Sequence, residues 1–311
     1  MSSTVSQTML QISKRPHDLT NGVIVAACNT VNGVEGANYS IPSVYNATIL
    51  TCSDPCALAT SCFPAYTTTA SSDGCACACA EGGHGDACLP VSVPEPPSTD
   101  DADLCLRDVR VGVEVNAGLG TSVACYVGVT FAADVVVDVE SMSGSVRNVT
   151  LANCTFLDGA SLYVFGWRSD PPAGQRADVL ISRLESRSGG GVVVANGFPP
   201  GSRITVVDSV LIAEARVAYR DAYDPGGASA CLVLRNVNLT GSVLTIARTH
   251  VAAVFRGAVG VLVVGGVALQ SWGALYMDGL SVQTALGLCV SVEGGVAASG
   301  GSVVAFVDSD F

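Results

Sequence analysis

The chain has 311 residues, which is enough for one large or two ordinary domains with a substantial core. Apolar residues make up 49% of it, yet aromatic residues only 6% and charged residues 14%, so small and β-branched side chains carry the apolar content. The net charge of −12, with Lys14 as the only lysine, argues against binding to nucleic acid or anionic membranes, because clustered basic side chains are needed to neutralise phosphates.

Residues 1–50 are predicted to form an irregular β segment, because short apolar runs such as NGVIVAAC alternate with polar breaks. The opening residues, MSSTVSQTMLQISKRP, lack a basic segment followed by an apolar run, so no signal peptide is visible. The most apolar stretch, at 257–270, is too short and too rich in glycine to span a bilayer and is interpreted as core. We therefore expect neither a signal peptide nor a transmembrane helix in this chain.

Residues 51–89 are predicted to be a small disulfide-rich module. Six of their cysteines are separated by 3, 5, 12, 1 and 10 residues, close to the order of an EGF-like module. Cys79 is extra and could pair with Cys28 or Cys105, because connectivity cannot be read from spacing alone. The disulfide candidates are Cys52, Cys56, Cys62, Cys75, Cys77, Cys79, Cys88 and Cys105.

Two other interpretations of this module concern His84, in the run GGHGDAC. Zinc requires ligands at spacings that converge on a tetrahedron, and Cys-x-Cys-x-Cys with one nearby histidine matches poorly, so no metal or cofactor is expected. The Gly-His-Gly followed by Asp86 is similar to the histidine loop of β-helical polygalacturonases, but it precedes the repeats and lacks their paired acids. A glycine-rich turn with a solvated histidine is the preferred interpretation.

Export from the cell is indicated by thirteen cysteines, eight of them from Cys52 to Cys105, because cytosolic proteins rarely use cysteine in this way. Residues 90–104, PVSVPEPPSTDDADL, combine four prolines with an acidic run and are predicted to be a linker. Five N-glycosylation sequons agree with the exported compartment. Their asparagines are Asn38, Asn46, Asn148, Asn153 and Asn238.

Residues 105–311 contain an internal repeat. Six segments can be superposed: VTLANCTF, VLISRLES, ITVVDSVL, LVLRNVNL, LVVGGVAL and VAFVDSDF. Their fifth positions are Asn153, Arg183, Asp208, Asn236, Gly266 and Asp308.

Short strands without helices, with corner residues that tolerate left-handed backbone, predict an all-β fold. The expected architecture is a right-handed parallel β-helix, a pectin-lyase-like solenoid of about seven coils. The rival fold is a β-sandwich, which also uses short alternating strands but needs no such repeat. The ending VVAFVDSDF matches half a coil, so we expect the repeats to be truncated at the C-terminus and the chain to be part of a longer protein.

Acids are sparse within the repeats. Asp208, Asp308 and Asp310 could form a carboxylate column for Ca²⁺ or glycosidic chemistry if their registers align, but corner aspartates are more often turn formers. A hydrolase triad is unsupported because Gly-x-Ser-x-Gly is missing, and a Walker loop is unsupported because it needs Gly-Lys-Ser/Thr, which the only lysine, Lys14, cannot supply. No catalytic residue is therefore assigned.

The Cys-rich run CSDPCALATSCFPAYTTTASSDGCACACAEGGHGDACLP, followed by VRNVTLANCTF and CLVLRNVNLTGSVLTIAR, resembles the dispersed gene family of very large trypanosome surface glycoproteins. The resemblance extends over nearly the whole chain. It implies a multicopy surface protein with long β-helical regions, Cys-rich inserts and C-terminal membrane segments, and it supplies no catalytic residues. The chain departs from the family in lacking signal and membrane segments.

The resemblance leads us to expect a non-enzymatic cell-surface or secreted glycoprotein segment that takes part in adhesion. The expected partners are host surface or matrix proteins or glycans, with no nucleic acid. The alternative is a polysaccharide lyase or hydrolase of the pectin-lyase type, which requires carboxylates from adjacent coils in one groove.

Overall fold

The computed structural model describes most of the chain from Cys105 onward and short pieces before it. Apart from one turn of 3-10 helix, η4 (Val139–Ser141), every element of the described part is a β-strand. The described residues are 10–12, 23–27, 29–31, 34–35, 39–42, 45, 47–50, 67–70, 77–79, 105–157, 159–187, 190–213, 230–307 and 309–310.

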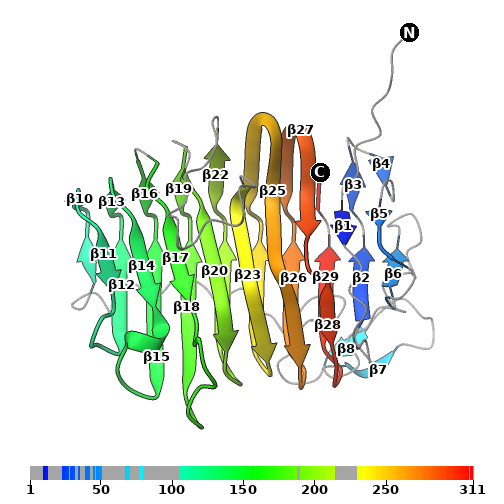
Figure 1. Cartoon of the computed structure of the whole chain (residues 1–311), viewed down its shortest axis with the longest axis horizontal. Coiled ribbons are helices and arrows are strands. Elements are labelled where there is room, and N and C mark those ends of the chain that lie inside the picture. The colour runs from blue at the N-terminus through cyan, green and yellow to red at the C-terminus, as the bar shows by residue number, and fades with distance from the viewer. Residues whose placement is uncertain are drawn as a thin grey trace.

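Successive strands wind round the three faces of a parallel β-solenoid, so each strand pairs with the equivalent strand of the next coil (Figure 1). The first face contains β9 (Leu106–Arg107), β12 (Val123–Val127), β15 (Val146–Ala152), β18 (Arg176–Ser182), β21 (Arg203–Val207), β24 (Val243–Ala247), β26 (Ala274–Asp278) and β29 (Val303–Val307).

The second face contains β10 (Arg110–Val111), β13 (Thr130–Phe131), β16 (Thr155–Phe156), β19 (Glu185–Ser186), β22 (Val210–Ala213) and the first parts of β25 (His250–Gln270) and β27 (Ser281–Val292). The two long strands continue onto the third face, where they join β11 (Val115–Ala117), β14 (Val135–Asp138), β17 (Leu162–Phe165), β20 (Val192–Phe198), β23 (Ala230–Thr240) and β28 (Val296–Ala298).

This architecture confirms the predicted all-β solenoid. The ladders between coils are parallel, for example Val149 with Val179 and Val179 with Ile204. A β-sandwich would place antiparallel neighbours in two facing sheets, so the rival fold is wrong. Antiparallel strand pairs in the described part are confined to two small hairpins, β3 (Thr30–Val31) with β4 (Val34–Glu35) and β7 (Thr67–Ala70) with β8 (Cys77–Cys79).

The N-terminal strands lie at the far end of the rod, beyond the C-terminal coil. β2 (Val23–Ala27) pairs in parallel with β29, and β6 (Ala47–Leu50) pairs with β2. β1 (Leu10–Ile12) pairs with β27 and with β5 (Tyr39–Ser40). Figure 1 shows these blue strands beside the red C-terminal ones. The sequence order, which puts residues 1–50 ahead of the repeats, does not reveal this placement.

Alternation of side chains fills the inside of the solenoid with one continuous apolar cluster, which runs from Ala117 in an early coil to Phe306 and Ile24 at the far end. Full burial of one valine, leucine, isoleucine or phenylalanine side chain stabilises the folded state by about 1.5–3 kcal/mol. A second apolar cluster lies on the outward side of the third face, where Tyr163 and Phe165 stack at 6.1 Å between ring centroids. The rod therefore buries both sides of part of this face.

Each coil leaves the first face through one residue in the left-handed conformation. Asn153, Arg183 and Asp208 occupy this corner in three successive coils, with φ of 53°, 51° and 52°. The backbone N–H of each donates to a carbonyl of the next coil, and Arg248 and Gly279 continue the column. The predicted corner role of the first three residues is therefore confirmed.

Two residues of the predicted repeat belong to another corner. Asn236 and Gly266 also have positive φ, of 48° and 86°, but they lie in β23 and β25 on the third face. Their superposition on Asn153 is therefore wrong. The sequence pattern was misleading because both kinds of corner follow an apolar strand and select residues that tolerate the left-handed conformation. Asp308 lies outside the described residues.

Candidate functional surface

The corner column of the first face carries paired charges. Asp208 accepts two hydrogen bonds from Arg248 of the next coil, at 2.7 and 3.1 Å. This bidentate hydrogen bonding holds the pKa of Asp208 below its usual range, with Arg183 acting in the same direction, and raises the pKa of Arg248. Both side chains are well exposed, so water screens the pair and its stabilisation is at most about 1 kcal/mol.

The proposed carboxylate column is not formed by Asp208 and Asp310. Asp310 aligns across successive coils with Ser281, His250 and Val210, so it occupies a different place in the coil. Its Oδ1 accepts a hydrogen bond of 2.8 Å from the hydroxyl of Thr30, which ties it to the N-terminal segment. Asp208 occupies a turn with left-handed backbone, as the turn interpretation predicts, whereas its pairing with Arg248 was not predicted.

His250 and Ser281 form a pair that the sequence analysis missed, because they lie 31 residues apart and share no motif. The His250 Nδ1 lies 3.1 Å from the Ser281 hydroxyl oxygen. In a Ser-His-Asp hydrolase the acid orients the histidine, whereas here Asp310 lies on the far side of the serine. His250, Ser281 and Asp310 therefore form polar contacts between successive coils, but the histidine does not lie between the serine and the acid as serine activation requires.

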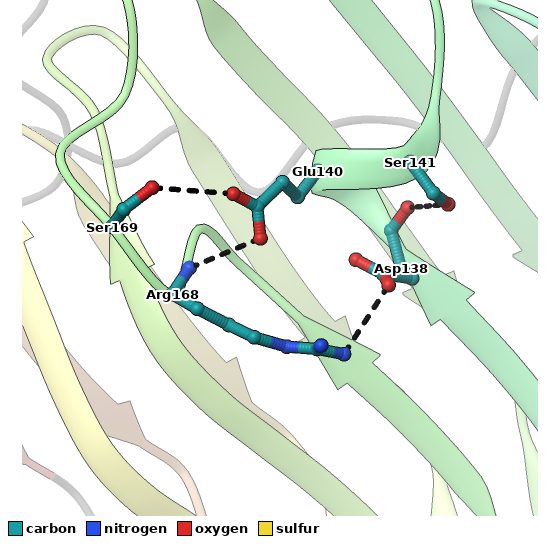
Figure 2. Close-up of polar contacts among 5 residues, drawn as sticks. All are labelled: Asp138, Glu140, Ser141, Arg168 and Ser169. Atoms are coloured by element: carbon teal, nitrogen blue, oxygen red, sulfur yellow. Dashed lines mark hydrogen bonds and ion pairs between the residues drawn. The ribbon is translucent and has the colours of Figure 1, made fainter.

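A second polar cluster joins the start of η4 to the turn after β17 (Figure 2). The Arg168 guanidinium lies 3.4 Å from the Asp138 carboxylate, and the Arg168 backbone N–H donates to Glu140 at 3.4 Å. The Ser169 hydroxyl donates to the other Glu140 oxygen at 3.3 Å, and the Ser141 hydroxyl donates to the Asp138 carbonyl at 2.7 Å. One arginine thus engages both acids, which fastens the turn to the neighbouring coil.

The described part of the chain offers no metal centre: no group of three or more His, Cys, Asp or Glu side chains is placed there to hold an ion. The same described residues contain no helix long and apolar enough to cross a membrane. His84 and Asp86 lie outside the described residues, so the glycine-rich turn stays a prediction.

The three sequon asparagines of the solenoid are exposed. Asn148 lies in β15 on the first face, and Asn153 follows at the corner of the same coil. Asn238 lies in β23 on the third face, where the hydroxyl of Thr240, the last residue of its sequon, donates to its side-chain oxygen at 3.2 Å. Asn38 and Asn46 lie outside the described residues. Glycans on the solenoid asparagines would extend from at least two faces.

One disulfide of the described residues joins Cys105 to Cys125. Cys105 immediately precedes β9, and Cys125 lies at the equivalent place in β12, since the ladder between these strands pairs Leu106 with Tyr126. The bond therefore joins adjacent coils. The sequence analysis named Cys105 but missed its partner, although their separation of 20 residues was a signal of one short coil. Cys79 therefore does not bond to Cys105 here. The other disulfide candidates, Cys52, Cys56, Cys62, Cys75 and Cys88, lie outside the described residues, and Cys77 and Cys79 lie in β8.

Three free cysteines are buried inside the solenoid. Burial raises the pKa of the Cys154 thiol to about 11 and that of Cys231 to about 12, and it also raises the pKa of Cys289. These groups are thiols rather than thiolates at neutral pH, so they behave as small apolar side chains and not as nucleophiles.

Comparison with known proteins gives one match. The model of the DGF-1 beta-sheet domain matches residues 148–310, just over half of the chain. This range begins within β15 and includes the corner column and the long strands of the later coils. No curated protein and no solved structure matches the chain.

Proposed function

Because this chain belongs to the DGF-1 family, the dispersed gene family of trypanosome surface proteins, we propose that it is a non-enzymatic adhesive segment of a surface glycoprotein. Its partners in this proposal are host-cell surface or extracellular-matrix proteins or glycans. The chain itself is placed at the cell surface or in the secreted fraction. Adhesion through a broad outer surface, rather than through a cleft, is the mechanism.

The observation that carries this proposal is the filled interior of the solenoid. A continuous apolar cluster occupies it from end to end of the described coils. A ligand therefore has to bind on the outside, where parallel coils provide a long, stiff face. Asp208 and Asp138 pair with arginine side chains, and Glu140 accepts from the Arg168 backbone N–H, which supports a structural role for these three acids.

The sequons support the same proposal. Asn148, Asn153 and Asn238 are exposed, and a glycan needs an accessible asparagine. Glycans at these places would cover parts of the first and third faces and would direct a partner to the remaining surface. We also propose right-handed winding, since about 98% of parallel crossover connections have that hand.

The Cys-rich segment extends the proposal beyond the rod. We propose that residues 51–89 form an EGF-like module and that residues 90–104 link it to the solenoid. The hairpin of β7 and β8, in which Ala70 pairs with Cys77, is compatible with a small disulfide-rich module. Such a module would present a second contact surface to a partner.

The test uses the full chain, produced in an oxidising eukaryotic host. Binding to immobilised matrix proteins and to host-cell surface glycans is measured by biolayer interferometry, and we expect saturable binding. Peptide mapping under non-reducing conditions on the same material should report glycans at the sequons and disulfides in residues 51–89.

A matched control carries Asn148→Gln, Asn153→Gly and Asn238→Gln, which removes the solenoid glycans, and the glycine keeps the left-handed backbone of the Asn153 corner. If neither the glycosylated nor the control chain binds any matrix protein or glycan, the adhesive function is wrong. Release of reducing or unsaturated ends from polysaccharides by the purified chain would instead support the lyase or hydrolase alternative.

A further inference from the structure

An exposed tryptophan occupies the turn between β25 and β26. Trp272 is 53% exposed, whereas Trp167, the other tryptophan of the chain, is 4% exposed and packs against the Arg147 guanidinium at 4.5 Å. Trp167 has an evident structural role. Trp272 leaves half of the largest apolar side chain in water, so core packing does not explain its presence.

The backbone at this turn is unfavourable for any bulky residue. The Gly273 N–H donates to the Gln270 carbonyl at 2.9 Å, and the two central residues, Ser271 and Trp272, have φ of 47° and 69°. Turns with two successive positive φ angles strongly favour glycine or asparagine. A tryptophan in this conformation is an outlier, and such outliers concentrate at functional positions.

The next coil provides the comparison. Its equivalent turn is closed by a hydrogen bond from the Ser302 N–H to the Ser299 carbonyl, and its central residues are Gly300 and Gly301, with φ of 61° and 77°. Both turns have two successive positive φ angles, and the second one uses the glycines that such angles favour. The tryptophan is therefore not required by the turn itself.

The glycine turn supports one side of the indole. The backbone N–H of Trp272 donates to the Gly300 carbonyl at 3.1 Å, and this hydrogen bond stacks the two turns. A Cβ on Gly301 would collide with the Cζ3 and Cε3 atoms of the indole, so the six-membered ring lies where a side chain would otherwise be. Gln270 and Ser271, the two residues before Trp272 in this turn, are exposed. The turn thus presents a supported aromatic surface together with an exposed amide and an exposed hydroxyl.

We propose that Trp272 is a stacking platform for the pyranose ring of a neutral glycan. This inference rests on the proposed adhesive function and names one ligand class for it. The aliphatic C–H face of a sugar packs on an aromatic ring, while its hydroxyls require donors and acceptors at the rim, which Gln270 and Ser271 supply.

A protein partner fits this place less well than a sugar. The other large apolar side chains exposed in the described part are on residues 106–123, at Ile49 and at Val254. None of these described side chains belongs to the turn of Trp272 or to the glycine turn stacked on it. Protein interfaces need a contiguous buried centre, whereas one ring is enough for one sugar. The net charge of −12 favours neutral over acidic glycans.

The test measures binding of the full glycosylated chain to an array of neutral hexose-terminated oligosaccharides, followed by titration of the best one. Trp272→Gly removes the ring and places the residue that its φ favours, so its melting temperature should equal or exceed that of the parent chain. We expect about a tenfold or greater loss of affinity in Trp272→Gly and a loss of less than about threefold in Trp272→Tyr. Subtracting the emission spectrum of Trp272→Gly from that of the parent isolates the fluorescence of Trp272, which should change when the sugar binds.

Val254→Ser, at another exposed apolar position, is the matched control and should bind as the parent does. Unchanged glycan affinity in Trp272→Gly would overturn the proposal. Binding of the parent to matrix proteins but to no neutral glycan would overturn it while leaving the adhesive function intact. Binding to nothing would overturn both, and loss of a protein ligand alone in Trp272→Gly would show that the platform serves a protein.

Discussion

The two ends of the solenoid are closed in different ways. At the first end, the disulfide between Cys105 and Cys125 ties the first coil to the second, while Leu106, Val113 and Leu119 stay exposed. At the far end, strands from the N-terminus cover the last coil. The buried Asn29 side chain forms two hydrogen bonds with the backbone of that coil, at Phe306 and Ser309.

The difference follows from chain separation. The first two coils are joined by a disulfide across only 20 residues, so local connectivity brings them together. Asn29 and Ser309 are 280 residues apart, so their contact has a larger entropic cost of loop closure. That end is held by core packing and by buried hydrogen bonds. Its integrity therefore depends on the rest of the fold, whereas the first end has its own covalent constraint.

The largest effect is expected from Phe306→Ala. Phe306 is buried in the core, and its register partners are Met277 on one side and Ala26 of β2 on the other. Removing the ring leaves a cavity at the joint and should lower the free energy of unfolding by about 3–5 kcal/mol in chemical denaturation. Leu106→Ala, at an exposed place on the first coil, should cost less than about 1 kcal/mol. Equal losses in the two variants would contradict the comparison.

Removing the staple of the first end should have the next largest effect. The double variant Cys105→Ala and Cys125→Ala removes a cross-link between residues 20 apart in sequence, so the unfolded chain gains conformational entropy. The free energy of unfolding should fall by about 3 kcal/mol. Hydrogen exchange should rise in β9 to β12 and stay unchanged in β2 and β29. Increased exchange at both ends would show that the staple acts on the whole rod.

Asn29→Ala tests the hydrogen bonds of the far end. The Asn29 amide donates to the Phe306 carbonyl at 2.9 Å, and its oxygen accepts from the Ser309 N–H at 3.0 Å. Alanine leaves both buried backbone groups unpaired, so the free energy of unfolding should fall by about 2 kcal/mol, with faster exchange in β2 and β29. Asn116→Ala, exposed on the first coil, is the matched control and should change little. A neutral Asn29→Ala would mean that water replaces the amide.

The smallest effect is expected between the ends, at Arg248→Ala. Loss of the exposed pair with Asp208 should cost no more than about 1 kcal/mol. Because folding lowers the pKa of Asp208, the contribution of the pair is present above about pH 4 and is lost as pH falls through the lower pKa of the folded state. Parent and variant should therefore converge in stability as pH falls through this lowered pKa. A difference that persists there would come from packing of the arginine stem instead.

The repeat was readable because of its left-handed corners. Asn153, Arg183 and Asp208 follow similar apolar strands at intervals close to one coil, so pattern alone places them correctly. The register failed at Asn236 and Gly266, because a second corner selects the same residue types. The turns between strands differ in length, so the number of residues per coil varies. Only the hydrogen-bonded ladders identify which strands of successive coils are equivalent.

The functional surface was less predictable. The sequons and Cys105 could be named from short motifs and cysteine use, whereas Cys125, the pairing of Asp208 with Arg248 and the stacked turns of Trp272 and Gly301 could not. These contacts join different coils, and their spacing depends on the varying length of each coil.

By itself, the sequence determined the all-β solenoid, its apolar interior and its family, because strand periodicity and corner residues are local properties. Only the tertiary structure decided that β2 follows β29 and that Trp272 stacks on Gly301. Such contacts depend on which surfaces can be buried together across hundreds of residues, and no local pattern encodes that choice.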